Sequence, residues 1–161
     1  MTRLRHRQRP HPLPEGSPMD EASRNKQLVR DSIEQIWVQQ RFDQVDRFLA
    51  PDFVDHGALP GTPPGPAGFA DGVRRMLAAF PDAHNHIHDL VAEGDRVVTR
   101  WTMTGTHTGD GLGLPATGRA VRIDGITLAR IANGQIAEHW IYRDDIAMLR
   151  QLGLMPGAPA R

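Results

Sequence analysis

The order of the segments along the chain limits its fold more than any other feature. Apolar residues follow helical spacing in the first half and strand-like alternation in the second. Helical spacing appears over 22–40, over 42–51 and again from Phe69 to Phe80, just before Pro81. Strand-like runs follow at 84–92, 96–108, 119–131 and 135–143. Helices followed by hairpin-linked strands predict an α+β fold, in which helices cover one face of a curved sheet.

The composition excludes several classes of protein. Nineteen lysines and arginines balance nineteen aspartates and glutamates, whereas a nucleic-acid partner requires excess basic charge. The chain has no cysteine, which removes disulfide scaffolds and thiolate chemistry and agrees with a reducing cytoplasm. No stretch approaches the roughly 18 consecutive apolar residues of a membrane helix. We therefore expect a cytoplasmic domain that binds a hydrophobic small molecule, with neither nucleic acid nor membrane as a partner.

The length of 161 residues fits one folded domain with tails. Residues 1–20 are basic and rich in proline, with few large apolar side chains, which predicts a disordered tail. The regular patterns begin after this segment and end near 155, so we expect one domain over 21–155 and a short C-terminal tail over 156–161.

Short motifs recur in order between about residues 22 and 153. They include APDFVDH at 50–56, FPD at 80–82, AEGDRV at 92–97, GTHTG at 105–109 and GQIAEHW at 134–140. Together they resemble the SnoaL-like polyketide cyclases, also called predicted ester cyclases. The resemblance implies the fold of the nuclear transport factor 2-like superfamily, an α+β barrel in which a cone-shaped, curved antiparallel sheet is wrapped by N-terminal helices. It also implies an internal pocket and dimers or tetramers formed through the sheet, of which we expect a homodimer.

Alternation along the last strand divides its side chains between two faces. One face carries an aliphatic residue and two aromatic residues, Ile136, Trp140 and Tyr142, so we expect this face to line the pocket. Asp144 then lies at the rim, where loss of water would raise the pKa of a carboxyl group as a general base requires. The alternative is that Asp144 caps a final helix over 145–152.

A histidine follows the strand that contains Trp101 and Met103. All three share one parity, so we expect Trp101 and Met103 to face the pocket and His107 to lie near its mouth. An imidazole there can donate a hydrogen bond or carry a proton. The alternative is a histidine that anchors the following loop to its backbone.

Up to Ile123 the larger apolar residues of the third predicted strand have odd numbers, and the next two, beginning with Ile126, have even numbers. Such a switch between the two faces of a strand predicts a bulge near Gly125. If the face of Ile126 is internal, Asp124 is internal too. The resemblance implies an acid/base aspartate in this region of the sheet, which makes Asp124 the leading catalytic candidate. Many relatives carry a histidine where this chain has Thr127, so histidine chemistry at that position is not expected here.

Two further histidine-containing segments are candidates. The resemblance implies that Asp55 and His56 lie near the cavity entrance and bind substrate, although they could equally fix the loop that follows. Three histidines alternate within 84–88, a spacing that could bind a metal. Ile87 indicates that the opposite face is the buried one, so we expect exposed histidines and no metal site.

The resemblance, taken with these residues, implies an enzyme that closes a ring in a polyketide-like molecule by a metal-free intramolecular aldol reaction, without a cofactor. Asp124 or Asp144 would remove an acidic proton, and His107 would stabilise the oxygen that becomes negative. Flat apolar walls would come from Trp101, Met103, Trp140 and Tyr142.

Two alternatives remain from the residues alone. One is another acid/base enzyme on the same fold, such as an isomerase or an epoxide-opening enzyme. The latter typically holds an arginine between two aspartates in its pocket, and alternation places Arg100 and Arg143 opposite the neighbouring tryptophans. The other alternative is a binding protein without catalysis, because this fold serves both kinds of function.

Overall fold

The computed structural model describes residues 20–59 and 61–155. The predicted tails over 1–20 and 156–161 lie outside this range, except for Asp20. Its carboxylate accepts a hydrogen bond from the backbone N–H of Ser23 and so caps the first helix. Within the described residues, no helix is long and apolar enough to cross a membrane.

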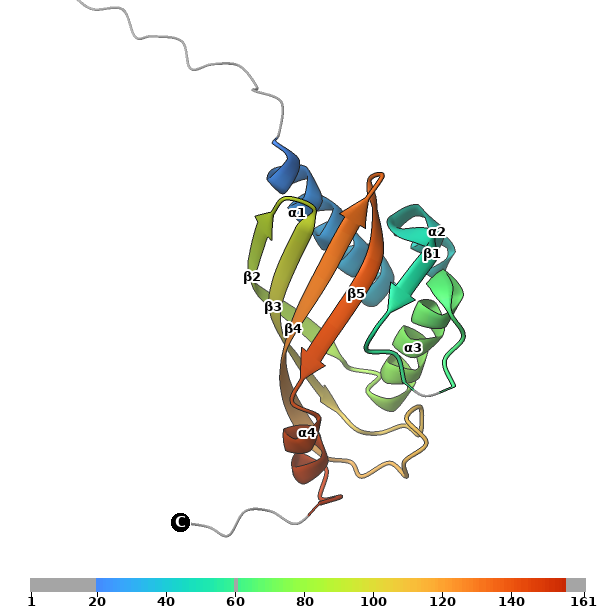
Figure 1. Cartoon of the computed structure of the whole chain (residues 1–161). Coiled ribbons are helices and arrows are strands. Elements are labelled where there is room, and N and C mark those ends of the chain that lie inside the picture. Colours follow the sequence, from blue (N-terminus) through green and yellow to red (C-terminus); the bar gives the residue numbers. More distant parts are fainter. Residues whose placement is uncertain (1–19, 60, 156–161) are drawn as a thin grey trace, which may run out of the picture.

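Most helices lie in the first half of the chain (Figure 1). The α-helices are α1 (Glu21–Ser32), α2 (Val45–Phe48), α3 (Gly65–Ala79) and α4 (Asp145–Gln151). The predicted helix over 22–40 changes at Ile33 into a π-helical segment, Ile33–Val38. The predicted helix over 42–51 is shorter than expected. It comprises a 3₁₀ turn and α2, and Pro51 already belongs to the first strand.

The strands form one open, mixed sheet in the part of the chain that the structure describes. They are β1 (Leu49–Asp55), β2 (His84–Glu93), β3 (Arg96–Thr106), β4 (Ala120–Ala132) and β5 (Gln135–Arg143), in the order β1-β5-β4-β3-β2. Strands β2 to β5 pair antiparallel as predicted, whereas β1 lies parallel to β5 at the edge. An edge strand tolerates Pro51, which has no backbone N–H to donate. The α+β fold class is confirmed, but the sheet is not wholly antiparallel and does not close.

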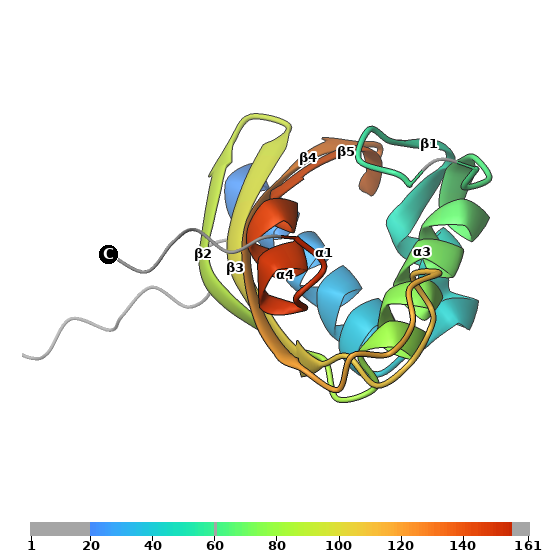
Figure 2. The same ribbon diagram turned by 90° about the horizontal axis from the view of Figure 1, so that it is seen from below.

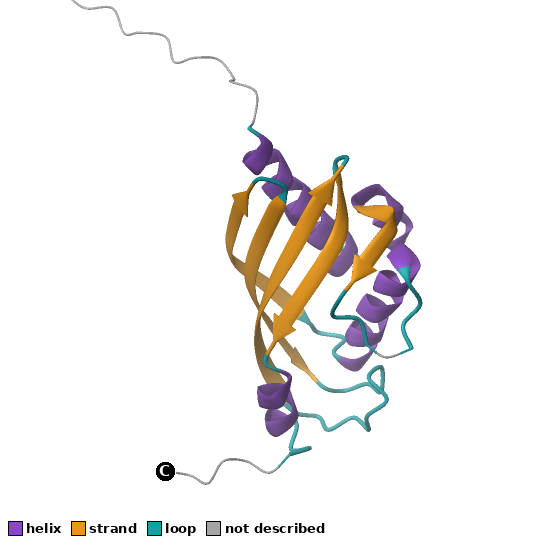
Figure 3. Ribbon diagram, in the orientation of Figure 1, coloured by secondary structure: helices purple, strands orange, loops and turns teal. Residues whose placement is uncertain are grey.

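The sheet curves around the helices. Viewed from below, its strands form an arc whose concave side faces α1 and α3, and α4 lies across the lower end of the molecule (Figure 2). The helices therefore gather on one face of the sheet, with the long loop between β3 and β4 at the lower end (Figure 3). Helices over one face of a curved sheet are expected from the order of the segments, and the cone shape is expected from the family resemblance.

The register of the three central strands places side chains in cross-strand rows. Strands β3 and β4 pair without interruption from Arg96 opposite Arg130 to Thr106 opposite Ala120. On the concave face the rows are Val97–Ala129–His139, Thr99–Thr127–Ile141 and Trp101–Gly125–Arg143. The bulge predicted near Gly125 is therefore wrong, and Val121 and Ile123 both face inward and are buried.

The irregularity lies instead at the start of β5. Ile131 pairs with Ile136 and Arg130 pairs with Glu138, so Ala137 is an extra residue in β5. One extra residue reverses the alternation that follows it. Ile136 faces the core as its apolar side chain predicts, but from Glu138 onward it is the odd-numbered residues that face inward.

Two clusters of buried side chains lie between the sheet and the helices, one toward each end of the cone. One joins α1, α2 and β1 to the upper part of the sheet and includes Val29, Phe48, Phe53 and Val97. The other lies at the lower end, where Met148 and Leu152 at the C-terminal end pack against Met76, Phe80 and the inward side chains of β3 and β4. The last helix thus closes the lower end of the cone.

Leu152→Ala tests this closure. Leu152 is 2% exposed, so its truncation should lower the free energy of unfolding by about 2–5 kcal/mol, measured by urea denaturation. Leu154, which is 42% exposed, provides the control, and Leu154→Ala should change stability by no more than about 0.5 kcal/mol. Equal losses in the two variants would contradict the packing described here.

Candidate functional site

An apolar cavity lies between the concave face of the sheet and the helices. Its volume is about 130 Å³, and its walls come from α1 and the π-helical segment, β1, α3 and the inward side chains of β2 to β5. Its polar lining residues are Ser32, Asn85, Thr99, Thr127, His139 and Arg143. A largely apolar hollow with a few convergent polar groups is typical of a small-molecule site.

Small inward residues on β4 create the room for this cavity. The indole of Trp101 lies across Gly125, where a Cβ atom would overlap Cζ2, Cη2 and Cε2 of the ring. Gly125 does not have a positive φ, so the approach of the indole, not backbone conformation, is what requires glycine. The indole Nε1–H donates to Oγ1 of Thr127 at 3.0 Å, which holds the ring against the sheet.

A histidine–aspartate pair lies at the other side of the cavity. Because β1 runs parallel to β5, Asp55 and His139 are direct neighbours, with 3.3 Å between Oδ1 and Nδ1. The backbone N–H of Gly57 also donates to this Oδ1 at 2.9 Å. The two side chains are only 20% and 14% exposed, and the imidazole packs against the rings of Phe53 and Phe69.

The pairing fixes the proton on the imidazole. A carboxylate only accepts hydrogen bonds, so Nδ1 of His139 is the donor to Asp55, and in the neutral form of the imidazole Nε2 holds the free lone pair. Burial raises the pKa of Asp55, but the hydrogen bond and charge of His139, the N–H of Gly57 and the charge of Arg143 outweigh it and hold the pKa below its ordinary value. Asp55 is thus ionised at neutral pH and can stabilise a protonated His139.

Arg143 brings a positive charge to the same cavity. It follows His139 by four residues on the inward face of β5 and lines the cavity, and its Nε–H donates to Oδ1 of Asp145 at 2.6 Å. The expectation that alternation keeps Arg143 out of the pocket is wrong, because the extra residue Ala137 reverses the alternation along β5. By contrast, Arg100 faces outward as expected and pairs with Asp89.

The structure corrects the placement of three predicted pocket residues on β5 and just after it. Trp140 and Tyr142 lie on the convex face, where Tyr142 is 68% exposed. Asp144 caps α4, since its Oδ1 accepts the backbone N–H of Ala147 at 2.8 Å. The extra residue Ala137 is the physical reason, because it turns this set of side chains away from the cavity.

Asp124 also lies outside the cavity. It faces the convex side of β4, with its side chain 66% exposed, and accepts hydrogen bonds from the Thr102 hydroxyl and from Arg122. The hydrogen bond from Thr102 holds the pKa of Asp124 below its ordinary value, the opposite of what a desolvated base requires. The expected internal position depended on a bulge near Gly125 that the register does not contain.

His107 is buried rather than placed at the pocket mouth. Its ring packs on Phe80, with centroids 5.2 Å apart, and is wholly inaccessible. The backbone N–H of Thr117 donates to its Nδ1 at 3.3 Å, and it is not among the cavity-lining residues. The structure therefore favours the alternative of a histidine that anchors the loop between β3 and β4.

His56 lies on the convex face, away from the cavity. Its ring stacks on Trp140 with centroids 4.5 Å apart and planes 6° apart, and its Nε2 contacts Glu138 at 2.9 Å. Of the predicted Asp55–His56 pair, only the aspartate lies beside the cavity.

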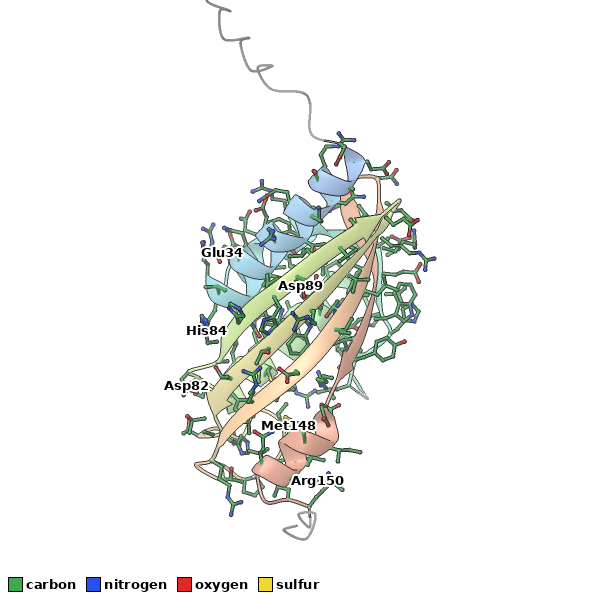
Figure 4. The ribbon with its side chains drawn as sticks, turned by 90° about the vertical axis from the view of Figure 1, so that its left-hand side faces the viewer. Glu34, Asp82, His84, Asp89, Met148 and Arg150 are labelled. Carbon is green, nitrogen blue, oxygen red and sulfur yellow. The ribbon has the colours of Figure 1, made fainter. Side chains whose placement is uncertain are left out.

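The structure agrees with two further expected placements of side chains. Trp101 and Met103 line the cavity. The three histidines within 84–88 are exposed, while Asn85 and Ile87 between them face inward. His84 lies on β2, at the side of the molecule that faces the viewer in Figure 4.

Reasoning from the sequence missed His139 as a site residue. The alternative set on β5, which contains Ala137, His139, Ile141 and Arg143, holds no carboxylate. The set chosen instead contains Glu138 and Asp144, and Glu138 is better suited to a solvent-facing ion pair such as the one it forms with Arg130. That charge pattern is the signal that would have favoured the other face.

Comparisons with known proteins show similarity in sequence and in structure. The chain matches the family model described as SnoaL-like polyketide cyclase over residues 27–152. It is 33% identical over 129 residues to aklanonic acid methyl ester cyclase DnrD of Streptomyces peucetius (78% of this chain, 88% of the relative). It is 32% identical over 115 residues to nogalonic acid methyl ester cyclase of Streptomyces nogalater (70% and 86%).

A solved structure extends the similarity to three dimensions. TsrD from Streptomyces laurentii superposes with a TM-score of 0.75 at 30% identity, over 86% of this chain and all of the other. The similarity confirms the fold expected from the motifs. The named sequence relatives are cyclases, which confirms the expectation of a cyclase-like enzyme.

The lowered pKa of Asp55 predicts a specific dependence of stability on pH. Ionised Asp55 stabilises the fold above the ordinary aspartate pKa of about 3.9, and this contribution is lost as the pH falls through the lower folded-state pKa. In Asp55→Asn, that part of the acid destabilisation should be missing in thermal unfolding between about pH 2 and pH 6. Asp52→Asn, which changes an exposed carboxylate on the same strand, should keep the wild-type slope. Identical slopes in Asp55→Asn and wild type would contradict the pairing.

Proposed function

We propose that this chain, which belongs to the SnoaL-like polyketide cyclase family, closes a ring in a polyketide methyl ester by an intramolecular aldol addition. The observation that carries the proposal is the His139–Asp55 pair at the wall of a largely apolar cavity. It supplies an imidazole that can act as a base, a carboxylate that orients it and largely apolar surroundings. The methyl esters named for the relatives give the class of substrate.

The first step is removal of a proton from carbon. Nε2 of His139 takes a proton from a carbon between two carbonyl groups, and the electron pair of the broken C–H bond delocalises into an enolate. Asp55 stabilises the imidazolium that forms, through the hydrogen bond at Nδ1. The charge of Arg143 at the edge of the cavity stabilises the negative oxygen.

The second step forms the ring. The enolate carbon attacks a ketone carbonyl of the same molecule, which makes a C–C bond and an alkoxide. The alkoxide takes the proton back from Nε2 of His139, so the imidazole returns to its starting state and no group leaves. Because every proton removed is returned, we propose a reaction without metal or cofactor. The flat indole of Trp101 supports the ring system of the substrate.

His139→Gln and Asp55→Asn test this mechanism with aklanonic acid methyl ester and nogalonic acid methyl ester as assay substrates. Loss of a positioned base or of its partner should lower turnover between about a hundred- and ten-thousandfold. Asp124→Asn, Asp144→Asn and His84→Gln are matched controls on the outside of the cavity, and each should keep turnover near wild type. Loss of turnover in Asp124→Asn or Asp144→Asn, with His139→Gln active, would contradict the mechanism, because the base would then be one of these aspartates and not His139.

We also propose a homodimer that forms through the convex face of the sheet. This face carries two apolar-rich rows, Val98–Leu128–Trp140 and Arg100–Ile126–Tyr142. Ile126 and Tyr142 are 45% and 68% exposed. Contiguous exposed apolar side chains are typical of protein–protein contacts, and a second copy of the chain offers the same surface.

Ile126→Lys combined with Tyr142→Lys tests the dimer. Two buried charges at the centre of the contact should convert the protein to a monomer of 17.9 kDa in sedimentation analysis at micromolar concentration. Val38→Lys, at an exposed position on the π-helical segment, should leave the wild-type mass unchanged. A wild-type protein that is already monomeric would contradict the proposal.

A further inference from the structure

One polar atom in the cavity wall has no partner. Thr99 lies at the centre of β3, is 1% exposed and lines the cavity. Its Oγ1 makes no hydrogen bond within the described residues. A buried hydroxyl without a partner destabilises a fold, and valine would fill the same space without that cost. A threonine here therefore calls for a partner that the chain itself does not supply.

The hydroxyl group of the neighbouring Thr127 can also donate a hydrogen bond to a ligand. Thr127 is the direct cross-strand partner of Thr99 and lines the same cavity. Its Oγ1 accepts the indole N–H of Trp101, and among the described residues its own O–H proton has no acceptor. Paired residues in a sheet hold their Cβ atoms about 5 Å apart, so both hydroxyls can reach one oxygen atom between them.

The strand register gives the distance between this pair of threonines and His139. His139 lies one row away from Thr99 and two strands across. Rows on one face are about 7 Å apart and strands about 4.8 Å apart, which gives roughly 12 Å between the two Cα atoms. Since both side chains project from these Cα atoms into the same cavity, one molecule can contact His139 with one end and Thr99 with another part of its ring system.

We propose that the hydroxyls of Thr99 and Thr127 form a hydrogen-bonding subsite for an oxygen of the substrate's ring system, remote from the carbon that His139 deprotonates. The two O–H groups donate to a carbonyl or ring hydroxyl oxygen, while Trp101 in the next row supports the ring. The subsite orients the substrate and selects oxygenated polycyclic molecules over apolar ones of equal size. It rests on the proposed function, because the methyl ester substrates define the ligand class.

Thr99→Val is the decisive variant, because it removes the hydroxyl and keeps the shape. It should be at least as stable to heat as wild type, since no hydrogen bond is lost within the chain. Its affinity for aklanonic acid methyl ester should fall about tenfold, the effect of one lost hydrogen bond. Thr99→Ser should keep wild-type affinity. Thr104→Val is the matched control, because Thr104 lies on the same strand but is exposed.

Binding is measured by calorimetry in the His139→Gln background, where turnover does not interfere. In the catalytic background, Thr99→Val should raise KM about tenfold and leave kcat within about twofold, as expected for an orienting contact made in substrate and transition state alike. Unchanged affinity in Thr99→Val would overturn the subsite and leave water as the partner of the hydroxyl. Failure of the wild-type protein to bind the ester would overturn it too. If the ester binds in a Thr99-dependent manner but is never cyclised, the subsite stands and the proposed reaction fails.

Discussion

The extra residue at the start of β5 determines what the cavity contains. Without Ala137, the pairing of Ile131 with Ile136 would continue into an alternation that turns Glu138, Trp140 and Tyr142 inward. With it, the carboxylate and the aromatic side chains face outward, and His139 faces the cavity. The parallel pairing of β1 with β5 then brings Asp55 directly beside His139. Two local features of the sheet edge thus assemble the less exposed of the two histidine–carboxylate pairs among the described residues.

A cavity of this kind costs stability, because its walls lose the contacts that side chains would otherwise make. The cone tolerates that cost through the two clusters above and below the cavity, where Phe53 and Val97 on one side and Phe80 and Leu152 on the other are almost fully buried. The small inward residues of β4 keep the cavity open between them. Trp101 uses the space over Gly125, so the floor of the cavity is flat and held in place by the hydrogen bond to Thr127.

The order and type of the elements could be predicted from spacing, since helical and strand periodicities differ and the chain changes from one to the other near Pro81. Spacing could not predict which side chains of each strand face the cavity. An inward residue is normally the larger apolar one, but here the cavity requires Gly125, Thr127 and Ala129 inside, while Ile126 and Tyr142 are exposed outside. Apolar content therefore pointed to the wrong face of β5 and to a false bulge in β4. The parallel pairing of β1, which places Asp55 beside His139, is a long-range contact that leaves no local pattern in the sequence.

The central claim is that His139 removes a proton from carbon. Incorporation of deuterium into aklanonic acid methyl ester in D₂O, followed by NMR before ring closure is complete, tests it directly. The account predicts that wild-type protein and Asp124→Asn exchange the proton of the carbon between two carbonyl groups faster than buffer alone, and that His139→Gln exchanges it at the rate of buffer. Exchange by His139→Gln at the wild-type rate would contradict the account, because the base would then lie elsewhere in the chain.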